Sequence, residues 1–228
     1  MLTPEEITAL LLSFKVAGWG VVAALPLALC LGYVLARGRF AGKFIVEGLV
    51  NLPLVLPPVV VGYLLLLSFG VRGPVGAWLA EVGGFRLVFS WVGAALATGI
   101  VTLPFQVRMI RLAIEAVDPR LETMAETLGA ARWDRWVNVL LPLTLPGIIA
   151  GVTTAFSAGL GQFGAIITFV ANVPGETRTL PLAIYTAIQA PGGEVQAARL
   201  AMLAIGLALA GLFLSEWLGR RARALVHQ

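Results

Sequence analysis

Few residues of this sequence could perform chemistry, and none of them stands beside a suitable partner. Cys30 lies inside an apolar run and His227 is next to the last residue, so the sequence offers neither a metal-ligand cluster nor a nucleophile with a histidine base. The nearest match to a phosphate-binding P-loop, Gly38 to Lys43, is one residue short and continues with Phe44. We therefore expect no catalytic residue, no bound metal and no bound cofactor, so the chain is not an enzyme by itself.

Residues 118–146 form the longest stretch that is too polar to lie in lipid, yet they carry apolar stripes at helical spacing. Asp118 and Pro119 are typical of a helix start. Apolar residues then recur at i, i+3, i+4 and i+7, and polar residues face the other side. The apolar set is Leu121, Met124, Ala125 and Leu128, and the polar set is Glu122, Thr123, Glu126 and Thr127. Gly129 ends the helix, because glycine accepts a positive φ.

A second amphipathic helix follows at once. Its apolar residues are Trp133, Trp136, Val137 and Leu140. The pattern predicts a short helix, a bend at Gly129 and a second helix that leads into an apolar run beginning around Pro142 and Pro146. Such a pair can pack as a hairpin on its own chain or dock on a separate protein. The remaining sequence offers almost no soluble core, which favours the second alternative.

The rest of the chain has the composition of an integral membrane protein. Of its 228 residues, 59% are hydrophobic and 12% are charged. Soluble domains are roughly one-quarter charged. The net charge of +4 does not indicate a nucleic-acid partner, because the basic residues flank apolar runs instead of forming one patch. We expect one all-α membrane domain over residues 1–228, surrounded by lipid.

Apolar runs predict five transmembrane helices, because each approaches the roughly 20 residues that a span requires. The predicted spans cover approximately residues 12–36, 45–70, 87–108, 142–171 and 198–219. Pro53, Pro57 and Pro58 remove backbone donors from the second span, which we expect to be bent and packed inside a bundle. The charge-free stretch from Trp136 to Gly175 is too long for one helix, so it must include loop or re-entrant segments.

Basic residues predict the orientation of the chain. They concentrate between spans one and two, between spans three and four, and after span five: Arg37, Arg39, Lys43; Arg108, Arg111, Arg120, Arg132, Arg135; Arg220, Arg221 and Arg223. The positive-inside rule then places the N-terminus outside, and the C-terminus and residues 118–142 in the cytoplasm. The chain is thus predicted to be a multi-pass protein of the cytoplasmic membrane.

The fourth predicted span combines small and polar residues. Four small residues at i+4 spacing, which let helix backbones approach closely, predict a helix-packing face: Gly147, Gly151, Ala155 and Gly159. Polar or small groups beside them could line a transport path or form interhelical hydrogen bonds, and the sequence leaves both alternatives open: Thr154, Ser157, Gly161, Gln162 and Gly164. No Asp, Glu, Lys or Arg is expected deep in a span, so energy for transport would come from another subunit.

The spacing from Gly129 through nine residues to Val139-x-Leu141-Pro142 resembles the Glu-Ala-Ala loop of bacterial ABC importer permeases. The whole chain is similar to molybdate permeases of that family, notably in residues 51–66, 111–133, 141–151 and 163–181. Residues 118–142 are hereafter the coupling segment. Its candidate ATPase-contacting residues, implied by the resemblance, are Glu122, Thr123, Ala125, Glu126, Gly129, Ala130, Trp133, Val139, Leu141 and Pro142.

The resemblance implies an ABC importer permease with cytoplasmic coupling helices. It implies a homodimer of two permease copies, two cytoplasmic ATPase subunits that use ATP, and a periplasmic or lipid-anchored oxyanion-binding protein. Molybdate is the implied solute, with tungstate or sulfate/thiosulfate as alternatives; a self-sufficient secondary carrier or channel is a further hypothesis. Thr123 stands where the family has its glutamate, so Glu122 or Glu126 must replace that carboxylate or the contact is lost. Gln162 stands where relatives commonly have glutamate.

Overall fold

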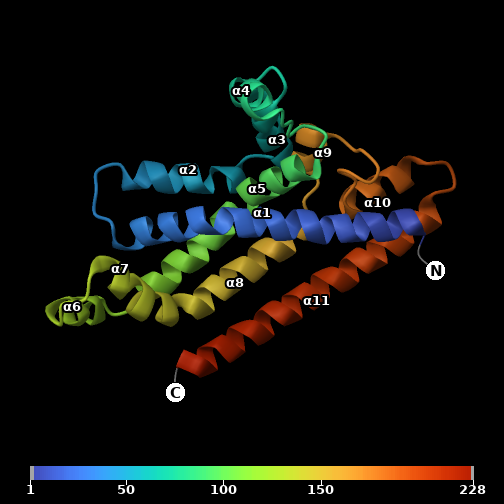
Figure 1. Cartoon of the computed structure of the whole chain (residues 1–228). Helices are drawn as coiled ribbons and strands as arrows, with labels where there is room; N and C mark the ends of the chain where they lie inside the picture. Colours follow the sequence, from blue (N-terminus) through green and yellow to red (C-terminus); the bar gives the residue numbers. More distant parts are fainter. Residues whose placement is uncertain (1–2, 227–228) are drawn as a thin grey trace.

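The computed structural model describes residues 3–226, and within that range every regular element is helical (Figure 1). The elements are α1 (Pro4–Arg37), α2 (Lys43–Val55), α3 (Pro58–Phe69), α4 (Pro74–Gly83), α5 (Trp91–Glu115), α6 (Pro119–Thr127), α7 (Arg132–Arg135), a π-helical turn (Trp136–Leu140), α8 (Leu141–Leu160), α9 (Gly164–Val170), α10 (Leu180–Gln189) and α11 (Glu194–Val226). The prediction of an all-α membrane protein is confirmed.

Four helical stretches within the described residues are long and apolar enough to cross a membrane, and a fifth results if α2 and α3 count as one broken span. The four are α1, α5, the continuous run Arg132–Leu160 and the first part of α11. The helices do not follow the predicted span limits. α1 begins at Pro4, well before residue 12, α5 continues to Glu115, and α8 already ends at Leu160. Several of these helices therefore include charged residues at their ends. Charge-free runs could not predict these extensions.

Local sequence explains where α1 begins. Pro4 occupies the first turn, and Thr3 and Glu6 form a reciprocal capping box. The Glu6 side chain is only 2% exposed and also forms an ion pair with Arg199 in the first part of α11. This pair joins the first turn of the chain to its last helix, and Figure 1 shows the two helices meeting near the N-terminus.

The second apolar run is broken between α2 and α3. Leu56 is extended, Pro57 and Pro58 follow it, and the two helices meet at an angle of 112°. Proline has no backbone donor and restricts the residue before it, so neither helix can continue through this point. The bend turns α3 onto α9, where a Cβ at Gly62 would lie 2.6 Å from the carbonyl oxygen of Ala165.

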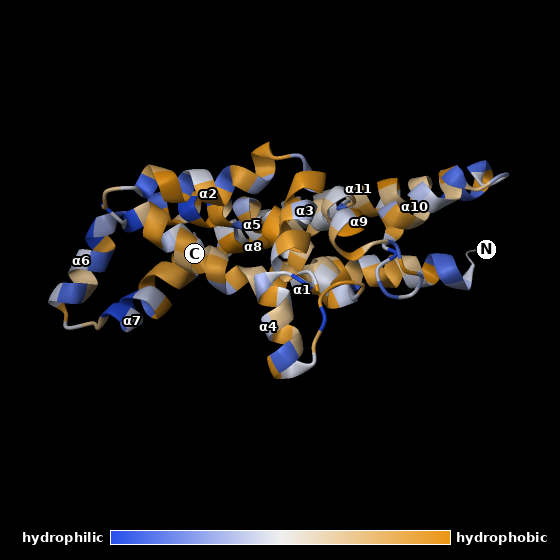
Figure 2. Cartoon of the chain, turned by 90° about the horizontal axis from the view of Figure 1, so that it is seen from above, coloured by the Kyte–Doolittle hydropathy of each residue, from blue (hydrophilic) through white to orange (hydrophobic). Residues whose placement is uncertain are grey.

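The core is built on the crossing of α1 and α5. Gly20 and Gly99 face each other there: a Cβ at Gly20 would lie 2.6 Å from the Ala95 carbonyl oxygen, and one at Gly99 would lie 2.7 Å from the Gly20 carbonyl oxygen. Ala17 and Ala94 beside them are fully buried. Only residues without bulky side chains permit such an approach of two backbones. Figure 2 shows apolar residues along the length of this bundle and hydrophilic residues gathered at α6 and α7.

Candidate coupling surface and transport path

The coupling segment has its own start and stop signals. The Asp118 side chain accepts a hydrogen bond from the Arg120 amide at 2.9 Å and caps α6. At the other end Gly129 has a φ of 90°, and the Ala130 amide donates to the Ala125 carbonyl at 3.0 Å. This arrangement is the glycine C-cap expected from the sequence, and it turns the chain sharply toward α7.

The large apolar side chains of α6 are exposed in the described chain. Leu121, Met124 and Leu128 are 42%, 60% and 88% exposed, and Trp133 after the bend is 73% exposed. Large apolar side chains exposed together mark an interaction surface when the segment is too polar for lipid. The alternative of a hairpin packed on its own chain does not describe this face.

Two ion pairs fix the other face of α6. Glu122 pairs with Arg37 at the end of α1 at 2.8 Å, and the same arginine donates to the Val117 carbonyl at 2.9 Å. Glu126 pairs with Arg135 at 2.6 Å. The Glu122 side chain is 20% exposed and that of Glu126 is 63% exposed. Of the two carboxylates that could replace the family's glutamate, Glu126 is therefore the more accessible.

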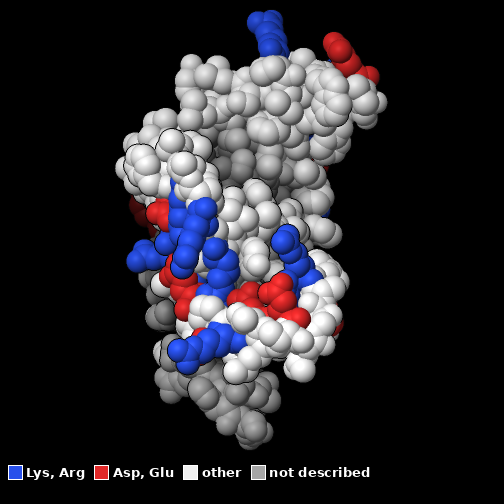
Figure 3. Space-filling model, turned by 90° about the vertical axis from the view of Figure 1, so that its left-hand side faces the viewer, with Lys and Arg blue, Asp and Glu red and all other residues white. Residues whose placement is uncertain are grey.

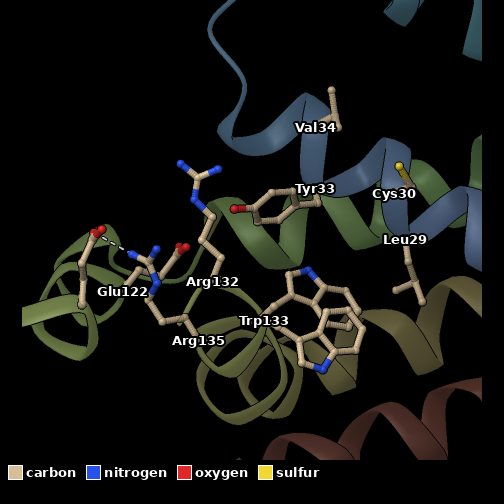
Figure 4. A pocket seen from close by; sticks show the side chains of 10 residues that line it. Leu29, Cys30, Tyr33, Val34, Glu122, Arg132, Trp133 and Arg135 are labelled. Carbon is tan, nitrogen blue, oxygen red and sulfur yellow. Dashed lines mark hydrogen bonds and ion pairs between the residues drawn. The ribbon is translucent and has the colours of Figure 1, made fainter. Parts of the chain in front are cut away.

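A groove of about 750 Å³ separates the coupling segment from the C-terminal half of α1. Leu29, Cys30, Tyr33 and Val34 of α1 form one wall (Figure 4). The facing wall consists of Glu122, Glu126, Arg132, Trp133, Arg135 and Trp136. The two tryptophans stack with ring centroids 5.8 Å apart, which gives this part of the loop a rigid aromatic surface.

The segment continues into α8 without a break. Between α7 and α8 the helix widens to a π turn, in which the Leu141 amide donates to the Trp136 carbonyl. This turn directly precedes Pro142, whose ring would clash with a carbonyl four residues earlier in a regular α-helix. Val139 and Leu141 are half-buried here, while Pro142 is exposed. One continuous helical path therefore joins α7 to α8.

Charges surround this end of the bundle (Figure 3). Lys and Arg side chains lie beside Asp and Glu on the face that carries α6 and α7. Arg37, Arg111 and Arg135 each pair with a carboxylate. Thr123, at the family's glutamate position, is exposed, and its hydroxyl donates to the Pro119 carbonyl at 3.3 Å. Ala125 and Ala130 are half-buried beneath it.

The small-residue ladder of α8 lies against α5 and α1. A Cβ at Gly147 would lie 2.3 Å from the Cβ of Ala113, and one at Gly151 would lie 3.2 Å from the Cβ of Met109. Farther along, a Cβ at Gly159 would lie 2.9 Å from a Thr98 methyl, and Ala155 is fully buried. These four positions form a close helix contact, which is the geometry that their spacing predicts.

The candidate path residues do not share one surface within this chain. Thr154 and Gly161 are exposed, whereas Gly164 packs on Pro58, 3.0 Å from where its Cβ would lie. Ser157 donates to the Thr153 carbonyl and faces α11, with its oxygen 2.8 Å from a Cβ position on Gly211. Ser157 and Gly161 also line a cavity of about 290 Å³ between α8, α10 and α11. Helix packing thus accounts for Ser157 and Gly164.

Gln162 lies at the break between α8 and α9. It is 8% exposed, and its side-chain nitrogen has no hydrogen-bond partner in the described structure. A buried amide donor without a partner costs free energy, so such groups call for a structural or functional reason. An oxyanion acceptor would satisfy this donor, and Gln162 is therefore the path candidate with the clearest chemistry.

Sequence reasoning missed two polar features near the other end of the bundle. Lys15 lies inside α1, with its ammonium nitrogen 3.7 Å from the centroid of the Trp91 ring. After α9, Ala171 has a φ of 62°, and the buried Thr177 hydroxyl bridges the Ala171 carbonyl and the Val173 amide. The sequence alone could have singled out Lys15, because it is the only charged residue between Glu6 and Arg37.

Comparison with known proteins agrees with this architecture. Residues 8–224 match the family model described as binding-protein-dependent transport system inner membrane component. The chain belongs to this family. It is therefore a multi-pass protein of the inner membrane and the permease component of a binding-protein-dependent transporter.

Individual relatives cover nearly the whole chain. The chain is 52% identical over 223 residues to the molybdenum transport system permease protein ModB of Escherichia coli K12, covering 98% of this chain and 97% of that protein. It is 37% identical to the sulfate transport system permease protein CysT of the same organism, over 71% of this chain and 58% of that protein. A solved bacterial alginate ABC transporter has a similar fold, with a TM-score of 0.75 at 20% identity over 96% of this chain and 80% of that chain.

Proposed function

We propose that this permease forms the transmembrane path for molybdate in an ATP-driven importer. The observation that carries the proposal is the 52% identity over 98% of the chain to a molybdenum permease. Tungstate, sulfate and thiosulfate remain chemical alternatives, because they are tetrahedral dianions of the same kind. The relationship to the sulfate permease is weaker in identity and extent. Membership of a binding-protein-dependent family argues against a self-sufficient carrier or channel.

In this proposal the exposed face of α6 docks on a cytoplasmic ATPase subunit, which binds and hydrolyses the ATP. Its exposed Met124 and Leu128 would enter an apolar cleft, and the accessible Glu126 would stand in for the family's glutamate. The positive-inside rule supports a cytoplasmic position for this segment and an external N-terminus. Two permease copies, two ATPase subunits and a periplasmic or lipid-anchored oxyanion-binding protein complete the proposed importer.

Transport of labelled molybdate tests the proposal. Cells deleted for this chain should lose high-affinity uptake, and the plasmid-borne chain should restore it. In a competition series, excess tungstate should compete strongly and sulfate weakly, if the path serves the molybdate system. Restored uptake of sulfate without restored uptake of molybdate would assign the chain to the sulfate branch instead. Uptake into vesicles that lack every ATPase subunit would contradict the ATP-driven mechanism.

A further inference from the structure

Lys15 interrupts an otherwise uncharged apolar helix. The sequence from Ile7 to Phe14 and from Val16 to Ala36 contains no charged residue, and α1 runs through all of it. At 1.5 Å per residue, Lys15 lies about 16 Å from the start of a helix about 50 Å long, against a hydrocarbon layer about 30 Å thick. Ionisable residues within spans are costly, and they usually have a function.

The neighbour of Lys15 is aromatic and not acidic. Its ammonium nitrogen lies 3.7 Å from the ring centroid of Trp91, the first residue of α5, and no ion pair of Lys15 is found in the described part of the chain. Arg37, Arg111 and Arg199 differ, because each of them pairs with a carboxylate. A neutral ring orients the ammonium but leaves its positive charge uncompensated.

Lys15 lies on a helix that shares a buried cluster with α9, the element that follows the break at Gln162. Its helix neighbours Leu12 and Val16 are buried in the cluster that contains Ala165 and Ile166 of α9, which begins two residues after Gln162. The Lys15 side chain itself is exposed. The chain thus places an accessible, uncompensated cation toward the end of the bundle where α1 begins.

We propose that Lys15, oriented by Trp91, is a cationic contact for the oxyanion at this end of the path. The inference rests on the proposed import of a dianion. A carboxylate partner would compete with the anion for the ammonium, whereas an aromatic ring does not. A single exposed cation attracts the dianion without holding it, since conduction requires sites that are weak enough to release their ion. Trp91 is the positioning residue of the pair.

Cysteine chemistry tests the charge of Lys15 separately from its shape. Cys30 is the single cysteine of the chain, so the Cys30→Ser variant removes the native thiol of the permease. Because Cys30 lines the groove at the coupling segment, uptake by this variant is first compared with uptake by the unmodified chain. In the complete importer, Lys15→Cys in that background should import molybdate about fivefold more slowly, the effect of one exposed charge contact. Aminoethyl methanethiosulfonate restores a positive charge and should restore uptake. The neutral methyl and the negative sulfonatoethyl reagents should not.

A matched control is available one helical turn earlier. Leu11 is 63% exposed, and the three reagents should have equal effects on Leu11→Cys in the same background. Trp91→Leu should slow uptake less than Lys15→Cys, and Trp91→Phe should retain more uptake than Trp91→Leu. The same series in vesicles of neutral and of anionic lipid should give the same charge dependence.

Several results would overturn the inference. Normal uptake by Lys15→Cys, equal rescue by all three reagents, or a charge effect confined to anionic vesicles would each exclude a contact with the transported anion. A fall in assembly that accompanies the loss of uptake would assign Lys15 a structural role instead. If the unmodified chain imports no molybdate or sulfate, the proposed function fails; if it imports them and only the reagent pattern fails, that function stands and Lys15 is not a contact.

Discussion

The α8 ladder and the α6 stripe both follow helical spacing, but the ladder is closely packed and the large residues of the stripe are exposed. The α8 ladder consists of glycine and alanine, and it closes on α5 with Cβ positions 2.3 to 3.2 Å from its neighbours at Gly147 and Gly151. The large residues of the α6 stripe are leucine and methionine, and these are 42% to 88% exposed. In lipid, association depends on close backbone approach, so small residues form the internal contact. Large residues in a polar segment remain available to a second protein.

The largest expected effect concerns the closed contacts of the bundle. Gly20→Leu places a side chain where even a Cβ would lie 2.6 Å from the Ala95 carbonyl oxygen, so α1 and α5 must separate. Overpacking of this kind costs about 1–3 kcal/mol or more. We expect little monodisperse protein in detergent, as measured by size-exclusion chromatography.

The matched control for that change is Gly18→Leu. A Cβ at Gly18 meets nothing within 4 Å, and the same helix carries both positions. Gly18→Leu should therefore yield nearly normal protein. Equal losses for the two variants would mean that a leucine on this helix is harmful regardless of position, and that the approach of the two backbones does not limit stability.

Substitutions in the α6 stripe should weaken binding of the ATPase subunit and leave folding of the permease unchanged. Met124→Ser combined with Leu128→Ser removes two exposed apolar side chains, each worth about 1.5–3 kcal/mol when fully buried in an interface. We expect normal permease yield and loss of the co-purifying ATPase subunit in an affinity pull-down. Ile188→Ser is the control, because Ile188 is 65% exposed on α10 near the opposite end. Undiminished ATPase binding by the double variant would refute docking through this face.

The smallest expected effects concern the two ion pairs behind the stripe. Glu122 and Arg37 have side chains 20% and 19% exposed, so a double-mutant cycle with Glu122→Gln and Arg37→Gln should give a coupling energy of about 1 kcal/mol. The same cycle for Glu126 and Arg135 should give less, because the Glu126 side chain is 63% exposed. Thermal unfolding of the purified permease measures both. A larger coupling energy for the outer pair would reverse the assignment of Glu122 as the structural carboxylate.

Much of the coupling segment could be predicted from the sequence. The cap at Asp118, the positive φ at Gly129 and the second helix after it follow from local residue preferences, and the structure has all three. The predicted spans differ from the helix limits, because charge-free runs indicate the hydrocarbon layer and the helices extend beyond them. Lys15 illustrates the difference: it is a cation inside α1, directly before the charge-free run that begins at Val16.

The sequence alone determined the class of the protein, the number of apolar runs and the small-residue face of α8, because hydropathy and helical period act over neighbouring residues. Only the tertiary structure decided which groups meet. Arg37 meets Glu122 across 85 residues, Lys15 meets the ring of Trp91, and Ser157 turns to α11. These contacts depend on how the helices cross, and no local preference specifies the crossing. The physical reason is that each apolar helix is stable in lipid by itself, because its backbone hydrogen bonds are internal. Function instead requires polar groups from several helices to come together.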